Sequence, residues 1–161
     1  MDATPIPHFA VIWGLLPRLA CAALAGGAIG WNRHRAGKPA GIGTHALVAL
    51  GAGLFVAVPS GAGAGHIDAL SRTIQGVAAG VGFLGAGEIF RDTGPHAHVT
   101  GLTSAAALWV TAALGVTIVA GPVIQSAVVA AMVLAILEIA PRIEKRFPNH
   151  RGDGESGSTR Q

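Results

Sequence analysis

The stretch from Arg72 to Arg91 reads RTIQGVAAGVGFLGAGEIFR, and the interpretation of the whole chain starts from it. Between its two arginines only Thr73, Gln75 and Glu88 carry polar side chains. As an α-helix the segment between the arginines is roughly 27 Å long, close to the thickness of a bilayer's hydrocarbon core. The stretch therefore predicts a helix that spans a membrane.

Closely spaced glycines make this predicted helix unusually thin. The spacing Gly76-x-x-x-Gly80 lets neighbouring membrane helices approach each other closely, so we expect a central helix with other spans packed on it. A match to the dinucleotide-binding fingerprint, from Gly80 to Gly85, lacks the strand that this motif requires before it. We therefore favour helix packing over nucleotide binding for the glycines of this stretch: Gly76, Gly80, Gly82, Gly85 and Gly87.

The composition of the chain is that of a membrane protein. Hydrophobic residues make up 51% of the 161 residues and charged residues only 12%, which is too few charges to cover a water-exposed surface. We therefore expect the lipid bilayer to be the main partner. The net charge of +3 comes from basic residues that lie between apolar segments rather than in one patch, which argues against nucleic acid.

The apolar segments predict an all-α, polytopic membrane helix bundle with about five spans. The expected spans are residues 9–31, 41–58, 72–91, 102–120 and 123–140. We expect residues 60–70 and 92–99 to be loops. Residues 1–140 would then form the transmembrane domain, and residues 141–161, which are polar and rich in Gly and Ser, a disordered basic tail.

The distribution of lysine and arginine predicts the orientation of the bundle. With five spans, nine of the 11 basic residues fall on the side of the C-terminal tail, and only Arg18 and Arg72 approach the other side. Since basic residues are enriched in cytoplasmic loops, we expect the N-terminus outside and the C-terminus in the cytoplasm.

Several polar residues from separate spans are predicted to share one membrane depth at the cytoplasmic side. An ionisable group within a span is costly unless it is paired, so Glu88 is a candidate functional residue. Two structural alternatives stay open: an i,i+3 ion pair of Glu88 with Arg91, and an interfacial His45 that only bonds a neighbouring helix. The predicted polar set is Asn32, Arg33, Thr44, His45, Glu88, Arg91, Thr103 and Ser104.

The sequence gives no indication of an enzyme or of a bound cofactor. Only Glu88 and Glu138 are carboxylates within the predicted spans, and an all-protein magnesium cage needs several oxygen ligands. His96 and His98 lie in a predicted loop, so we interpret them as solvated side chains rather than as a metal site. We find no Ser-His-Asp or Cys-His set, no phosphate loop and no H-E-x-x-H motif.

Three segments together resemble the MgtC/SapB family of membrane proteins. GVGFLGAG at 80–87 and GLTSAAALW at 101–109 are similar to the hallmark pair of that family, and PAGIGTHALV at 39–48 fits the segment before them. The resemblance covers residues 18–121. It implies an inner-membrane protein with about five spans that is linked to growth under magnesium limitation. Many family members are thought to regulate other membrane proteins.

Two positions depart from the family pattern. Asn32-Arg33 stands where the family usually has Glu-Arg, and Gly43 stands where it usually has an arginine before Thr-His. Better-known members also carry a soluble C-terminal domain that this resemblance does not include.

Two functions follow as expectations. The first is a non-enzymatic regulator in magnesium-related homeostasis, acting with a membrane-protein partner or as a homo-oligomer. The alternative is a small oligomeric transporter or channel for magnesium or another cation. A transporter needs a polar path across the membrane, and the outer half offers only Arg18, Arg72, Thr73, Gln75 and Thr117, which favours the regulator.

Overall fold

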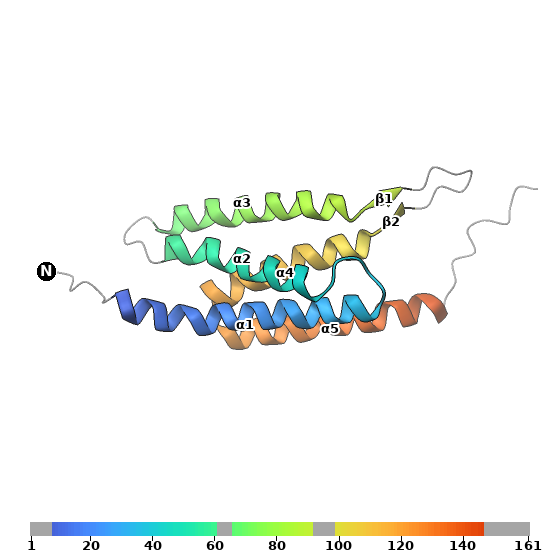
Figure 1. Ribbon diagram of the computed structural model, residues 1–161, viewed down its shortest axis with the longest axis horizontal. Helices are drawn as coiled ribbons and strands as arrows, with labels where there is room; N and C mark the ends of the chain where they lie inside the picture. The colour runs from blue at the N-terminus through green and yellow to red at the C-terminus, as the bar shows by residue number, and fades with distance from the viewer. Residues whose placement is uncertain (1–7, 61–65, 92–98, 147–161) are drawn as a thin grey trace, which may run out of the picture.

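The computed structural model describes residues 8–60, 66–91 and 99–146, which form five α-helices and one short antiparallel pair of strands (Figure 1). In chain order the elements are α1 His8–Arg35, α2 Ile42–Ser60, α3 His66–Gly87, β1 Phe90–Arg91, β2 Val99–Thr100, α4 Leu102–Ala120 and α5 Val123–Arg146. In the two-residue ladder Phe90 pairs with Thr100 and Arg91 with Val99.

The five helices run side by side along the long axis of the molecule (Figure 1). The end of α1, the start of α2, the end of α3, the start of α4 and the end of α5 all lie at the same end of the bundle. We call this the basic end, because α1 closes with Arg33, His34 and Arg35 and α5 with Lys145 and Arg146.

Helices α1, α2 and α4 form the tightly packed part of the bundle because small residues let their backbones meet. A Cβ atom added at Gly30 of α1 would lie 2.6 Å from the carbonyl oxygen of Gly41. Gly26 faces the carbonyl of His45 in the same way, and Gly115 of α4 faces that of Ala49. The main core is apolar and is drawn largely from α2 and α4: Ala52, Val56, Leu108, Ala112, Val116 and Val119.

Most glycines of α3 contact no other helix of this chain. A Cβ atom added at Gly76, Gly80, Gly82 or Gly87 would meet no heavy atom within 4 Å. Only Gly85 faces a neighbour, with such an atom 3.4 Å from the Cβ of Ala105. Within this chain, α3 lies on the outside of the bundle and packs through larger side chains such as Val77 and Val81, so a packing role for the other four glycines stays a prediction.

The ends of α3 also differ from the prediction. The helix begins at His66, inside the predicted loop, and ends at Gly87. Its last turn tightens, since the amides of Glu88 and Ile89 bond three residues back, to the carbonyls of Gly85 and Ala86. Phe90 and Arg91 then enter β1 rather than extending the helix. Most of the predicted loop at 92–99 lies outside the described residues.

The predicted class, an all-α membrane helix bundle, is confirmed. Four helices are long and apolar enough to cross a membrane: Trp13–Arg35, Ile42–Pro59, Leu102–Ala120 and Val123–Arg146. Helix α3, with 22 residues, is long enough but not apolar enough to be counted with them, because it carries Asp68, Arg72 and its glycines.

The last helix is longer than the sequence predicts. Helix α5 continues through Pro141 to Arg146, so the expected disordered tail is helical over its first six residues. An ion pair between Glu138 and Arg142, with the Nη2 and Oε1 atoms 2.5 Å apart, spans the proline. The remainder of the predicted tail, 147–161, lies outside the described residues.

Candidate functional site

Arg33 is the most deeply buried charged side chain in the described part of the chain, with 3% of it exposed. It follows Gly26 and Gly30 at helical spacing, so it lies on the face of α1 that packs against α2. Its Nε atom is buried and has no hydrogen-bond partner. A guanidinium in this position requires a compensating charge nearby.

His45 is completely buried in the first turns of α2. Its Nδ1 lies 3.0 Å from the carbonyl oxygen of Gly41, and because a carbonyl only accepts, Nδ1 is the donor of this bond. The same carbonyl also accepts the backbone amide of His45, at 3.2 Å. In the neutral ring Nε2 is then an acceptor, and this atom is buried without a partner.

Glu88 is placed just after α3 by its contact with the start of α4. Gly101 has a positive φ of 90° and packs against the carbonyl group of Glu88, so a side chain at position 101 would be both strained and obstructed. The Glu88 side chain is half-buried, and its Oε2 atom is fully covered and has no hydrogen-bond partner.

These three groups form one polar cluster at the basic end, drawn from α1, α2 and the end of α3. Both Arg33 and Glu88 interact electrostatically with the His45 imidazole. The cluster combines a guanidinium, a carboxyl group and an imidazole, and each contributes a buried atom without a hydrogen-bond partner. We call Arg33, His45 and Glu88 the buried triad.

The other residues of the predicted polar set have different environments. Ser104 is buried in the first turn of α4, whereas Thr103 is exposed. Thr44 lines the groove between α2 and α3, and Asn32 faces α5. The side chain of Arg91 is outside the described part of the structure, so its predicted pairing with Glu88 stays a prediction.

A second polar contact at the basic end joins α1 to α5. Asn32 Nδ2 donates to Glu138 Oε2 at 2.9 Å, and Arg142 donates to the other carboxylate oxygen. The sequence marks Glu138 as a carboxylate within a span but does not indicate its partner. Asn32 lies one helical turn before Arg35, at the depth where α5 becomes polar. This shared depth is the feature of the sequence that could have indicated the contact between Asn32 and Glu138.

Arg18 has a structural role near the opposite end. Its Nη1 donates to the carbonyl oxygens of Val119 at 2.7 Å and Gly121 at 3.1 Å. Val119 lies in the last turn of α4 and Gly121 is its C-cap. Carbonyls at the C-terminal end of a helix lack partners within it and carry partial negative charge.

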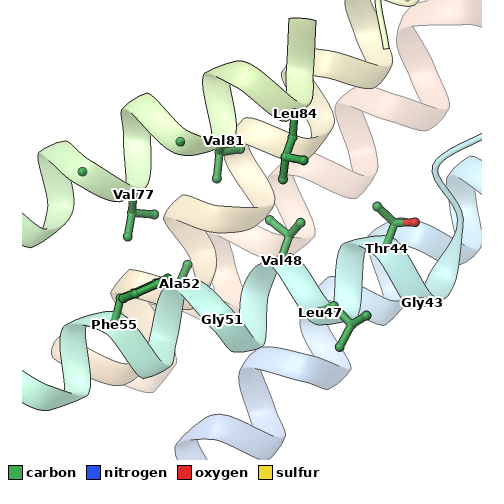
Figure 2. A pocket seen from close by; sticks show the side chains of 12 residues that line it. Gly43, Thr44, Leu47, Val48, Gly51, Ala52, Phe55, Val77, Val81 and Leu84 are labelled. Carbon is green, nitrogen blue, oxygen red and sulfur yellow. The ribbon is translucent and has the colours of Figure 1, made fainter. Parts of the chain in front are cut away.

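An open apolar groove of about 720 Å³ runs between α2 and α3. Figure 2 shows Val77, Val81 and Leu84 of α3 on one side of it and Val48 and Ala52 of α2 on the other. The groove exists because α3 touches its neighbours through these larger side chains while its glycines face open space. Its lining offers almost no polar atoms for a hydrophilic ligand.

The described residues hold no cluster of three or more His, Cys, Asp or Glu side chains able to bind a metal ion. Within the triad, His45 and Glu88 are two possible ligands, but the cation of Arg33 opposes a second positive charge beside them.

Apolar helices of membrane-spanning length and a buried triad at one end define an all-helical integral membrane protein. The model of the MgtC family matches residues 19–146, and the chain therefore belongs to the MgtC family. This confirms the resemblance in the sequence.

Three relatives illustrate the range of the family. The chain is 52% identical over 117 residues to "Protein SrpB" of Synechococcus elongatus, a match that covers 67% of this chain and 64% of the relative. It is 38% identical over 141 residues to "Putative magnesium transporter YhiD" of Escherichia coli K12, covering 82% of this chain and 63% of the relative. It is 39% identical over 118 residues to "Protein MgtC" of Brucella abortus, a match that covers 73% of this chain and 48% of the relative. No solved structure gives a significant match.

Proposed function

We propose that this protein acts in magnesium-related homeostasis, in adaptation to low magnesium, as a non-enzymatic regulator of other membrane proteins in the bacterial inner membrane. Membership of the MgtC family and the magnesium-related name of the Escherichia coli relative support the magnesium link. The matched region is about two thirds or less of each of the three relatives, so the proposal concerns the membrane domain.

The distribution of buried polar groups is the observation that favours a regulator over a transporter. Among the described residues the buried polar side chains are Arg33, His45, Ser104, Thr111 and Ser126. Thr111 and Ser126 bond carbonyls of their own helices, at 2.7 and 3.3 Å, so they offer no free groups along a path. The core between the two ends is closed by apolar side chains such as Val56, Leu108 and Val116.

A closed apolar core does not conduct a hydrated divalent cation, because dehydrating magnesium requires oxygen ligands in its place. The buried triad therefore acts within one end of the bundle, where it sets the relative positions of α1, α2 and α3. We infer that a partner membrane protein responds to that arrangement.

The alternative is a small oligomeric transporter or channel for magnesium or another cation. The observation in its favour is the triad itself, since ionisable groups inside membrane spans often mark ion pathways. In this alternative the path lies between copies of the chain, with Glu88 as the residue that meets the cation.

Two measurements on the same protein separate these functions. The first is growth of a low-magnesium-sensitive strain that expresses the chain, and the second is magnesium flux in proteoliposomes that contain the purified full chain. A regulator restores growth and gives no flux above empty liposomes. Flux that saturates with magnesium and is lost in Glu88→Gln would reject the regulator in favour of the transporter.

A further inference from the structure

A small polar pocket of about 200 Å³ lies between the end of α1 and the end of α5. Its lining consists of Asn32, Arg35, Ala36, Leu137 and Glu138. The pocket is separate from the buried triad, because Asn32 faces α5 whereas Arg33, one residue later, faces α2.

The carboxylate in this pocket is already occupied by hydrogen-bond donors. Glu138 accepts from Asn32 through one oxygen and from Arg142 through the other, at 2.9 and 2.5 Å. The charge of Glu138 is therefore balanced by Arg142. Arg35 is then the charged group of the lining that has no carboxylate partner within the described part of the chain.

The surroundings of the pocket are basic. At this end of the bundle, five exposed cations at the ends of α1 and α5 and in the loop after α1 outnumber the two carboxylates at the end of α5, Glu138 and Glu144. The cations are Arg35, Lys38, Arg142, Lys145 and Arg146. This charge complements an anionic ligand.

The depth of the pocket corresponds to the headgroup region of a bilayer. Trp31 lies one turn before Arg35 and is 55% exposed, as expected of a tryptophan at a membrane interface. On α5, Ile136 directly precedes the lining residue Leu137, is 60% exposed and presents apolar surface. A ligand with a charged head and apolar chains fits both features, whereas an acidic protein segment fits only the first.

We propose that this α1–α5 pocket binds the phosphate group of an anionic phospholipid, with Arg35 as its principal contact and the acyl chains along α5. Basic pockets between membrane helices are known to hold such headgroups. Arg142 is outside the lining and is paired with Glu138, so it contributes less. The negative charge of Glu138 opposes the ligand and weakens binding.

Native mass spectrometry of the purified full chain in detergent measures this binding with added phosphatidylglycerol, phosphatidylcholine or inorganic phosphate. We expect phosphatidylglycerol to bind more tightly than phosphatidylcholine, and inorganic phosphate not to compete at millimolar concentration. Arg35→Gln should weaken phosphatidylglycerol binding about fivefold, the effect of one basic residue near an anionic surface. Glu138→Gln should strengthen it.

The matched control is Arg72→Gln, which removes one exposed arginine from α3, away from the basic end. It should leave lipid binding unchanged, and the melting temperature of Arg35→Gln should equal that of the parent because Arg35 is exposed. Lys145→Gln removes another exposed cation from the end of α5, outside the lining of the pocket, and should give a smaller loss.

Three results would overturn the proposal. They are equal affinity for the two lipids, an equal loss in Arg35→Gln and Arg72→Gln, and full competition by inorganic phosphate. Binding of a soluble poly-glutamate peptide without any preference for phosphatidylglycerol would assign the pocket to a protein partner and would also reject it. The assay measures no magnesium and no growth, so its outcome is independent of the proposed function.

Discussion

At the scale of single residues, Arg33 has the most demanding environment in the described chain. Only 3% of the residue is exposed, and it lies beside a helix interface built from glycines, where water has little access. A buried charge of this kind is stable only with an opposite charge and hydrogen-bond partners. Glu88 and Arg33 both interact electrostatically with His45, although they form no direct ion pair in the described residues. We therefore expect Glu88 to be the compensating group.

The first prediction tests whether Arg33 and Glu88 compensate each other. Arg33→Met removes the cation and leaves a carboxylate in a half-buried site, so we expect a loss of about 3 kcal/mol in the free energy of unfolding. Glu88→Gln alone should also destabilise the protein. The double variant should lose clearly less than the sum of the two, because neither charge is then left alone.

Reversible unfolding in mixed detergent micelles, followed by circular dichroism, measures these differences. Additive losses would mean that the two charges are independent, and Glu88 would then be compensated by another group.

The second prediction concerns Arg18, which bonds the last carbonyls of α4. Arg18→Met keeps most of the side-chain volume and removes two charge-assisted hydrogen bonds, so we expect a loss of about 2 kcal/mol. Arg72→Met, at an exposed position, is the control and should change the stability little. The melting temperature in detergent measures both. If the two variants have the same melting temperature, the contact of Arg18 with the end of α4 does not contribute to the stability of the protein.

At the scale of helices, some glycines lie where two helices pack tightly, and others lie on an open helix surface. Gly26, Gly30 and Gly115 lie at backbone contacts among α1, α2 and α4, whereas most glycines of α3 face open space. The spacing of small residues in a sequence indicates where two helices can approach each other closely. It does not indicate on which side of the helix the neighbour lies. For this reason the sequence places the packing in α3, and the structure places it in α1, α2 and α4.

The third prediction follows from this difference. Gly115→Ala puts a methyl group against the carbonyl of Ala49, so we expect a loss of about 1–3 kcal/mol. Gly80→Ala meets no atom within 4 Å and replaces a glycine inside a helix, so it should raise stability by about 0.5–1 kcal/mol.

Thermal unfolding of the two alanine variants beside the parent measures both effects. A destabilised Gly80→Ala would contradict the open face of α3 and would show that another molecule packs on it in solution.

At the scale of the whole molecule, the sequence predicts helices better than it predicts contacts. The limits of α4 are predicted correctly because Gly101 and Gly121-Pro122 mark both ends. The end of α3 is missed since Ile89 and Phe90 continue the apolar run up to Arg91, although the chain leaves the helix after Gly87. The sequence predicts that Arg33, His45 and Glu88 lie at one membrane depth. Depth does not indicate toward which neighbouring helix each side chain points. Thr44, one residue before His45, therefore faces the groove instead.

The connections between helices bear on how many times the chain crosses the membrane. Helix α2 ends at the end opposite the basic end, and α4 starts at the basic end, so α3 must join the two ends (Figure 1). At the basic end this is fixed by the contacts of Gly85 with Ala105 and of Glu88 with Gly101. A helix of 22 residues is about 33 Å long, enough to cross the hydrocarbon core. We infer that α3 crosses the membrane although its composition is less apolar than that of the other four helices.

The last prediction is the resulting topology, with five crossings and the basic end in the cytoplasm. Reporter fusions after Lys38, Asp92 and Glu144 should read cytoplasmic, and a fusion after Gly65 should read external, because basic residues are retained on the cytoplasmic side. The fusions after Gly65 and Asp92 test α3 directly, since they bracket it. Equal readings from these two would mean that α3 does not cross. The fusion after Glu144 would then also read external, opposite to the charge distribution, so these sites together distinguish four crossings from five.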